Sequence, residues 1–403
     1  MTQLREASDT RGELRRSAQL ILHCAASGSR ERDADLGRII GAGVDWEAVL
    51  CAASRHSVLP SVYCALIPTF ASQLPTSVCD RMRREVHGNA LRNSYLTKEA
   101  VRLYRLLDKH GMRILVLKGP ALAAGVYGDV TLRQFTDLDL LVRKQDLDLA
   151  CSILADDVYR PQAPERSGAG RWQMTFVPEH GLFEVDLHWR LSPPYFPFTP
   201  DGDELWERAV EVQLGAGRVS TLGPDDLILF LCAHGAKHGW QTLSGVCDVE
   251  RATRNYQYEW EALVARAASL GSVRVLLLGL LLAGDLLGAP IPAALLDAAR
   301  ANPPVQRAAR IFRRYFFSLG TDGPGLRQRW SIPMAIFPGK LARLRYALCR
   351  AFLLGPRDFD FVRLPSALSP LYYAIRPLRL AWRKSPDLLR VAIPPPASRD
   401  LNN

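Results

Sequence analysis

The spacing of apolar side chains predicts a helical start to the chain. Residues 17–26 and 46–54 place apolar positions at helical intervals, and residues 97–110 carry them along one broad stripe. Gly111 then ends this last helix, as a glycine after the final turn commonly does. We therefore expect helices over most of residues 1–110.

The hydrophobic period changes after Gly111. Short apolar runs bounded by turn signals predict buried strands at 113–118, 137–142, 172–177 and 182–189. Helical spacing predicts helices at 120–127 and 144–155. A polar stretch rich in glycine and proline predicts a surface loop at 160–171. This alternation is typical of an α+β core in which helices surround a small mixed sheet.

Beyond Pro193 and Pro194 the pattern is helical and stays so. Helices are expected at 224–234, 259–270, 273–287, 292–301 and 304–317. The most apolar run, 275–284, is too short for the roughly 20 residues that span a bilayer, so it predicts a buried helix. The expected organisation is a helical region at 1–90, a core at 91–192 and a mostly helical region with a basic tail at 193–403.

Charge is unevenly distributed along the 403 residues. The net charge is +10, but residues 301–403 alone hold 18 Lys and Arg against 5 Asp and Glu. This stretch is either a solvated basic face or a site for an anionic partner, nucleic acid included. A disordered tail could not bury the apolar side chains in this stretch, so we expect it to pack on the helical region. These side chains are Ile311, Phe312, Tyr315, Phe316, Phe352 and Leu353.

The cysteines and the N-terminus indicate an intracellular protein. The eight cysteines form no CxxC pair and lie mostly in apolar surroundings, which predicts buried reduced thiols instead of disulfides or a zinc site. The first 20 residues are charged and lack the apolar stretch of a secretory signal. We therefore expect a cytoplasmic location.

Two short acidic stretches carry the candidate chemistry. Asp137 and Asp139 flank one leucine on a predicted strand, so both carboxylates point to the same face. On a later strand Glu184, Asp186 and His188 also share a face. Carboxylates this close repel unless a cation lies between them. If the two strands are neighbours, Asp186 completes a cluster of three carboxylates that suits Mg²⁺.

A phosphate-binding element is predicted just before the first acidic strand. Lys118 supplies a positive charge at a strand end, and Gly119 allows close approach of the backbone where a helix begins. Arg133 precedes Asp137 by four residues and is placed to reach a phosphate oxygen. His188 is interpreted as a partner of Asp186, as a base, or as a satisfied buried histidine.

In this order the elements resemble the DNA polymerase β-like nucleotidyltransferase fold, and more closely a large group of bacterial uncharacterised nucleotidyltransferases. The shared motifs are LKG-x₇-Y at 117–127, R-x₃-DxDLLV at 133–142, ExDLHW at 184–189, HGAKH at 234–238 with Asp248, LP at 364–365 and RPLR at 376–379. The broader fold has Gly-Ser or Gly-Gly where this chain has Gly119-Pro120, and it has a shorter spacing to the DxD. Lys118 and Arg133 would then replace the serine hydroxyl in gripping phosphate.

The resemblance implies an enzyme that moves a nucleoside monophosphate from a nucleoside triphosphate, ATP first, to an unidentified acceptor. A peptide natural product and a small molecule are both candidate acceptors. Two Mg²⁺ ions, or Mn²⁺, would be held by Asp137, Asp139 and Asp186, with Asp186 also activating the acceptor oxygen. Lys118, Gly119 and Arg133 would bind phosphates.

Other interpretations stay open. His234 and His238 share a helix face, but HGAKH lacks the glutamate of an HExxH zinc site. They form a zinc site, a patch facing the nucleotide with Lys237 towards phosphate, or a structural pair. Two rival functions remain: a non-catalytic nucleotide- or peptide-binding protein on the same fold, and a transferase that modifies nucleic acid.

Overall fold

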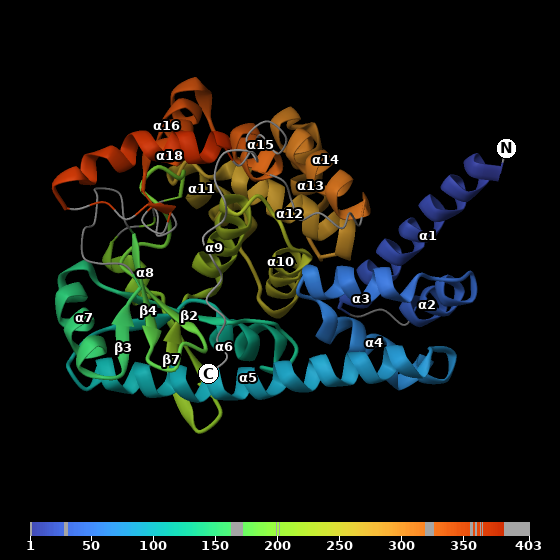
Figure 1. The fold of residues 1–403 in the computed structure, drawn as a ribbon, viewed down its shortest axis with the longest axis horizontal. Coiled ribbons are helices and arrows are strands. Elements are labelled where there is room, and N and C mark those ends of the chain that lie inside the picture. Colours follow the sequence, from blue (N-terminus) through green and yellow to red (C-terminus); the bar gives the residue numbers. More distant parts are fainter. Residues whose placement is uncertain are drawn as a thin grey trace. The chain divides into compact units, whose positions relative to one another are not determined.

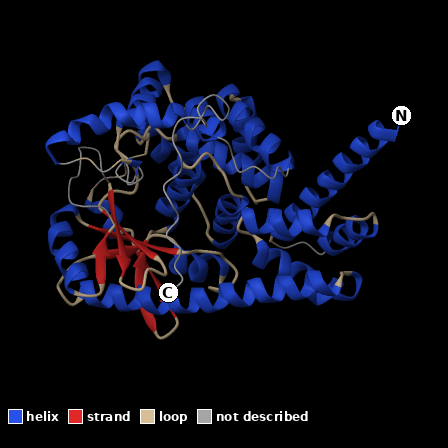
Figure 2. Cartoon of the chain, viewed as in Figure 1, coloured by secondary structure: helices blue, strands red, loops and turns tan. Residues whose placement is uncertain are grey.

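The computed structural model describes residues 2–27, 31–162, 172–198, 200, 202–318, 326–354, 358, 361–362, 364 and 366–382. The chain forms two compact units, one of residues 1–162 with 171–338 and one of residues 339–403 with 163–170. The candidate chemistry lies entirely in the first unit, which Figures 1 and 2 show as helices around a small sheet.

Helices lead into the sheet of the first unit. They are α1 (Thr2–Ala25), α2 (Glu31–Gly41), α3 (Trp46–Arg55), α4 (Leu59–Phe70), η1 (Ala71–Gln73) and α5 (Thr76–Asp108). The α/β part that follows contains β1 (Ile114–Val116), α6 (Gly119–Leu122), η2 (Ala123–Tyr127), β2 (Asp137–Val142), η3 (Lys144–Asp146), α7 (Leu147–Asp156), β3 (Tyr159–Pro161), β4 (Gln173–Pro178) and β5 (Glu184–His188). The helix α5 continues through residue 90, where the sequence predicted a boundary.

A hairpin and a set of helices complete the chain. The elements up to residue 338 are α8 (Asp203–Glu207), β6 (Val210–Leu214), β7 (Gly217–Thr221), α9 (Pro224–Lys237), α10 (Leu243–Asn255), α11 (Trp260–Ser269), α12 (Val273–Leu287), α13 (Ala293–Ala301), α14 (Pro303–Ser318) and α15 (Leu326–Ile336). The second unit contains α16 (Gly339–Phe352), η4 (Ser366–Leu371) and α18 (Tyr372–Trp382).

The main sheet has the order β1-β2-β5-β4-β3, with β2 and β5 parallel and the other pairs antiparallel. One face packs against α5, which lies beneath the sheet in Figure 1. Apolar side chains on this side form one buried cluster that includes Leu103 of α5, Leu138 and Leu140 of β2, and Val185 of β5. The alternating positions of β2 and β5, which are polar except for Leu141, therefore face away from α5.

The structure confirms the α+β class and most of the predicted elements. The expected strands appear as β1, β2, β4 and β5, and the run at 275–284 is the buried centre of α12. Within the described residues no helix is both long enough and apolar enough to cross a membrane. The predicted loop at 160–171 begins inside β3, and its residues from 163 on lie outside the described part.

The prediction that the chain is helical after Pro194 is wrong at the β6–β7 hairpin. Exposed charged and polar residues alternate with a few apolar ones there, and one side of the hairpin packs beside β1 and α5. Gly215 turns the chain with a φ of +57°, a conformation that glycine adopts easily. The hairpin is short and half exposed, so it has too few apolar residues to be recognised as strands from the sequence pattern.

Two further expectations are only partly correct. All eight cysteines are free, but Cys51 and Cys64 are exposed instead of buried. In the basic region, Phe312 and Phe316 of α14 are fully buried and α14 packs against α12 and α1. Phe352, by contrast, is 45% exposed in α16, so its predicted burial is wrong.

The close packing of α9 against the Trp240 side chain can be tested at Gly235. A Cβ added at Gly235 would lie 2.6–2.7 Å from ring atoms of Trp240, whose side chain is fully buried. Gly235→Ala should therefore lower the free energy of unfolding by about 1–3 kcal/mol, the usual cost of overpacking. Gly88→Ala is the control, because nothing lies within 4 Å of a Cβ in that exposed turn of α5. It should gain up to about 1 kcal/mol. Urea unfolding measures both, and equal effects would contradict the packing described.

Candidate functional site

The candidate site lies on the face of the sheet that is turned away from α5. The parallel pairing of β2 with β5 places Asp139 beside Asp186 and Leu141 beside His188. Asp137 pairs with Glu184 one step earlier along the same face. The polar side chains that alternation predicted on each strand therefore lie side by side on neighbouring strands.

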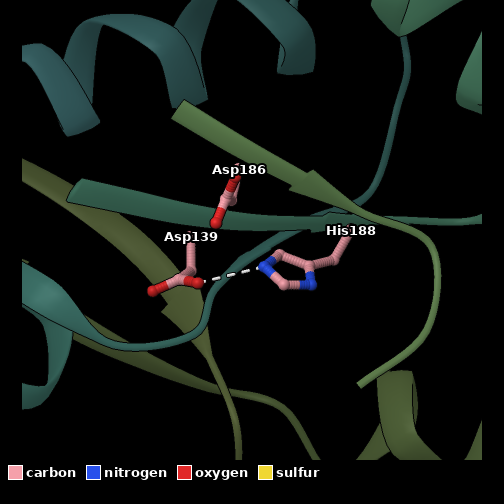
Figure 3. A group of neighbouring side chains, drawn as sticks. All are labelled: Asp139, Asp186 and His188. Carbon is pink, nitrogen blue, oxygen red and sulfur yellow. Dashed lines mark hydrogen bonds and ion pairs between the residues drawn. The ribbon is translucent and has the colours of Figure 1, made fainter. Parts of the chain in front are cut away.

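Three of these residues form a compact group, shown in Figure 3. Asp139, Asp186 and His188 each offer a ligand atom, and these atoms all lie within 4.8 Å of one another. His188 Nε2 is 3.0 Å from Asp139 Oδ1, and both side chains are buried. Asp137, the third carboxylate expected from the sequence, is not in this group, and His188 takes that place.

A lysine completes the surroundings of the central carboxylate. Lys118 Nζ lies 2.9 Å from Asp139 Oδ2, so one oxygen of Asp139 contacts the lysine and the other contacts His188. Lys118 comes directly before α6, where Gly119 has a φ of +53°. A Cβ at Gly119 would lie 3.4 Å from the carbonyl oxygen of Asp137, so the Lys-Gly pair fits the turn that brings the lysine to the sheet.

The two aspartates of the DxD have opposite electrostatic environments. Burial alone would raise the pKa of Asp139, but Lys118 and His188 beside it hold that pKa well below its usual range. Burial and the neighbouring Asp139 raise the pKa of Asp137, against the weaker opposing effects of Lys118 and Arg133. The site therefore keeps Asp139 ionised and carries more negative charge than its own cations offset.

The donor set fits a divalent cation. Carboxylate oxygens are preferred by Mg²⁺ and Mn²⁺, and an imidazole is a common ligand of transition-metal ions. The imidazole nitrogen of His188 that faces the carboxylates is Nε2, whereas Nδ1 is buried without a hydrogen-bond partner and points away from them in Figure 3. Asp139, Asp186 and His188 would hold the ion, with Asp137 next to them on β2.

The structure places Arg133 in a separate buried network. Its Nε and Nη2 donate to the two oxygens of Asp248 on α10, each at 2.9 Å, and the hydroxyl of Tyr127 donates to Asp248 at 2.7 Å. Burial, followed by Asp248, raises the pKa of Tyr127. Although burial opposes it, Asp248 also raises the pKa of Arg133. Asn93 of α5 holds the same loop by donating to the carbonyls of Val130 and Arg133.

The histidines of α9 border the site, but they do not belong to the carboxylate group. His234 and His238 lie with ring centroids 4.5 Å apart, and His234 is buried. Burial, then the charges of Lys118 and His238, lower the pKa of His234 well below its usual value. Lys237 lies over the ring of Trp172, with its Nζ 5.8 Å from the centroid. The end of α9 is therefore close enough to Lys118 for their charges to interact.

Two contacts went unnoticed in the sequence. Thr175 of β4 donates its hydroxyl to Asp186 at 2.5 Å, and Asp248 joins Tyr127 to Arg133. Thr175 has no sequence signal, because a threonine on a strand is ordinary. Asp248 and Tyr127 do lie within the shared motifs, but nothing in their spacing indicates that they meet.

Comparison with family models identifies the family of the chain. The model of a family described as uncharacterised nucleotidyltransferase matches residues 42–288, more than half of the chain. Among solved structures, a similar chain is the antibiotic-resistance factor ANT(2'')-Ia, with 14% identity and a TM-score of 0.32. The match covers 43% of the present chain and 92% of that one. No curated protein matches the sequence.

Removing the lysine tests the charge balance of the site. Lys118→Met leaves Asp139 buried without its cation, so the free energy of unfolding should fall by about 3 kcal/mol or more. Added Mg²⁺ or Mn²⁺ should restore much of this loss, because a divalent ion supplies the missing charge. Urea unfolding with and without each ion is the measurement, and Lys98→Met on the exposed side of α5 is the control. A loss that matches the control, or that no ion reduces, would contradict the balance described.

Proposed function

The chain belongs to the family of uncharacterised nucleotidyltransferases, and we propose that it moves a nucleoside monophosphate from a nucleoside triphosphate, ATP first, to an acceptor. Pyrophosphate is the second product. The observation that carries the proposal is the pairing of Asp139 with Asp186 on adjacent parallel strands, with Lys118 in contact with Asp139. This arrangement combines a cation site with a phosphate-binding charge.

The carboxylates hold the metal in this proposal. Asp139 and Asp186 bind it with His188, and Asp137 is the further carboxylate for a second ion. Bound Mg²⁺ or Mn²⁺ would supply the positive charge that stabilises the attacking and leaving oxygens of the transferred phosphate. Asp186 lies where it can also accept the proton of the acceptor, because its carboxylate is only partly buried.

His188 and Thr175 act by orienting the carboxylates. Without an ion, the ionised Asp139 can accept a hydrogen bond from Nε2–H of His188, which holds the imidazole beside the carboxylates; to ligate an ion through Nε2, the imidazole would carry its proton on Nδ1 instead. Thr175 holds one oxygen of Asp186 from the neighbouring strand. Side chains fixed in this way lose little freedom when a ligand binds.

Lys118 changes partner when the triphosphate binds. Its ammonium pairs with Asp139 in the structure, and a divalent ion there would free it for a phosphate oxygen nearby. Gly119 is proposed to bind phosphate with Lys118, and its positive φ makes the turn that brings the lysine to the sheet. Arg133 is also proposed to bind phosphate, and to do so it must exchange at least one of its two contacts with Asp248.

The contacts of Asp139 also favour a second function. Both of its oxygens are engaged by side chains of the chain itself, Lys118 and His188. A central carboxylate with both oxygens occupied in this way suits a nucleotide-binding protein that transfers nothing. The Asp139→Asn variant, compared with the wild type, distinguishes the two functions.

Asp139→Asn keeps the shape of the site and removes the ionised ligand. Turnover should fall by at least the roughly 10²–10³-fold that loss of one preorganised electrostatic contact costs elsewhere. Glu184→Gln is the matched control, since Glu184 lies on the same strand face but is exposed and bonded to Gln162. It should stay near wild type, and His238→Ala should have a milder effect than Asp139→Asn.

Activity is followed as pyrophosphate release from labelled triphosphates with Mg²⁺ or Mn²⁺ and cell extract, and mass spectrometry identifies the adduct. A thermal melt of each variant checks folding. Full activity in a normally melting Asp139→Asn protein would overturn the proposed route. Nucleotide binding without any adduct in the wild type would establish the second function.

A further inference from the structure

The second unit presents an unusual amount of apolar surface. Of the fifteen large apolar side chains that are exposed among the described residues, ten belong to residues 339–403. Single exposed leucines are ordinary on a protein surface, but a concentration of them marks a surface that contacts something else. The densest part of this surface is on α16.

Four of these side chains form a stripe along α16. Leu341, Leu344, Leu348 and Phe352 are 80%, 55%, 50% and 45% exposed. Their spacing of three, four and four residues places them on one face of the helix over its full length. We call this face the leucine stripe.

The opposite face of α16 already has its partners. Tyr346 is buried, and the carbonyl of Arg350 accepts a hydrogen bond from Arg376 of α18. Asp358, also buried, binds Arg376 and Arg379, which ties α18 into the unit. Figure 1 shows α16 and α18 next to each other. The leucine stripe is thus not the side on which the unit builds its interior.

The charge around the stripe selects the kind of partner. Within α16 there are four basic residues and no acidic one, and residues 339–403 hold twelve Lys and Arg against four Asp. In helical projection Lys340 and Arg345 flank the stripe on its two sides. A second copy of the chain would bring like charges together, whereas an anionic surface would neutralise them.

We infer that the leucine stripe of α16 docks on an anionic membrane surface, with the helix lying in the plane of the interface. Leucine and phenylalanine side chains would enter the boundary between headgroups and acyl chains, and Lys340 and the arginines would meet lipid phosphates. The helix is 14 residues long, so it lies on the bilayer and does not span it. Basic side chains flanking an apolar stripe extend their charged ends to the headgroups.

Sedimentation with vesicles tests the inference on the full-length protein. The protein should sediment with vesicles of 70% phosphatidylcholine and 30% phosphatidylglycerol at 0.1 M salt, and at least tenfold less with pure phosphatidylcholine. Each basic residue near an anionic surface raises the affinity for the vesicle roughly fivefold. Salt screens this attraction, so raising the salt to 0.5 M should weaken binding strongly. Leu344→Gln with Leu348→Gln should reduce binding at least tenfold.

The control is a second pair of exposed leucines. Leu91→Gln with Leu182→Gln changes side chains that are 61% and 78% exposed in the first unit, and it should bind vesicles as the wild type does. Equal binding by both double variants, or no binding by the wild type, would overturn the inference. So would a wild-type dimer that the α16 variant abolishes in light scattering. A sharp fall in the melting temperature of the α16 variant would show that the stripe is covered within the chain, and this result would also overturn the inference.

Discussion

The site depends on offsetting the negative charge that two parallel strands bring together. Pairing β2 with β5 sets Asp139 beside Asp186, with Asp137 one step away, on a face that excludes much of the solvent. Carboxylates this close and this buried repel strongly. Lys118 and His188 supply the compensation, and they do so unevenly, because both contact Asp139. The result is one ionised aspartate and one whose pKa is raised.

Because Lys118 and His188 both offset the charge of Asp139, the charge of Asp137 is left for a cation to neutralise. Asp137 has no ion pair among the described contacts, and the charges that oppose the rise of its pKa are chiefly Lys118 and then Arg133. Lys118 is committed to Asp139, and Arg133 is committed to Asp248. A divalent ion between the strands would therefore meet negative charge that the chain has left uncompensated. The same step would release Lys118, so metal binding and phosphate binding are electrostatically linked.

The sequence predicts the strands and the faces of this site, because both follow from local alternation. Asp137 and Asp139 must share a face, and so must Asp186 and His188. The register between β2 and β5 is not local, and it decides that His188, not Asp137, joins the compact group. The acidic pattern already predicts a metal site, and the resemblance to the family adds the nucleotide, but neither gives the contacts of each residue.

The partner of Arg133 could not be predicted from the sequence. Arg133 lies 115 residues before Asp248, and only the packing of α10 brings them together. The β6–β7 hairpin escaped notice for a related reason, since its stability comes from β1 and α5 and not from its own composition. Local pattern therefore identifies where charge is placed along the chain. Tertiary packing determines which charges are already satisfied, and so which residues are left to bind a ligand.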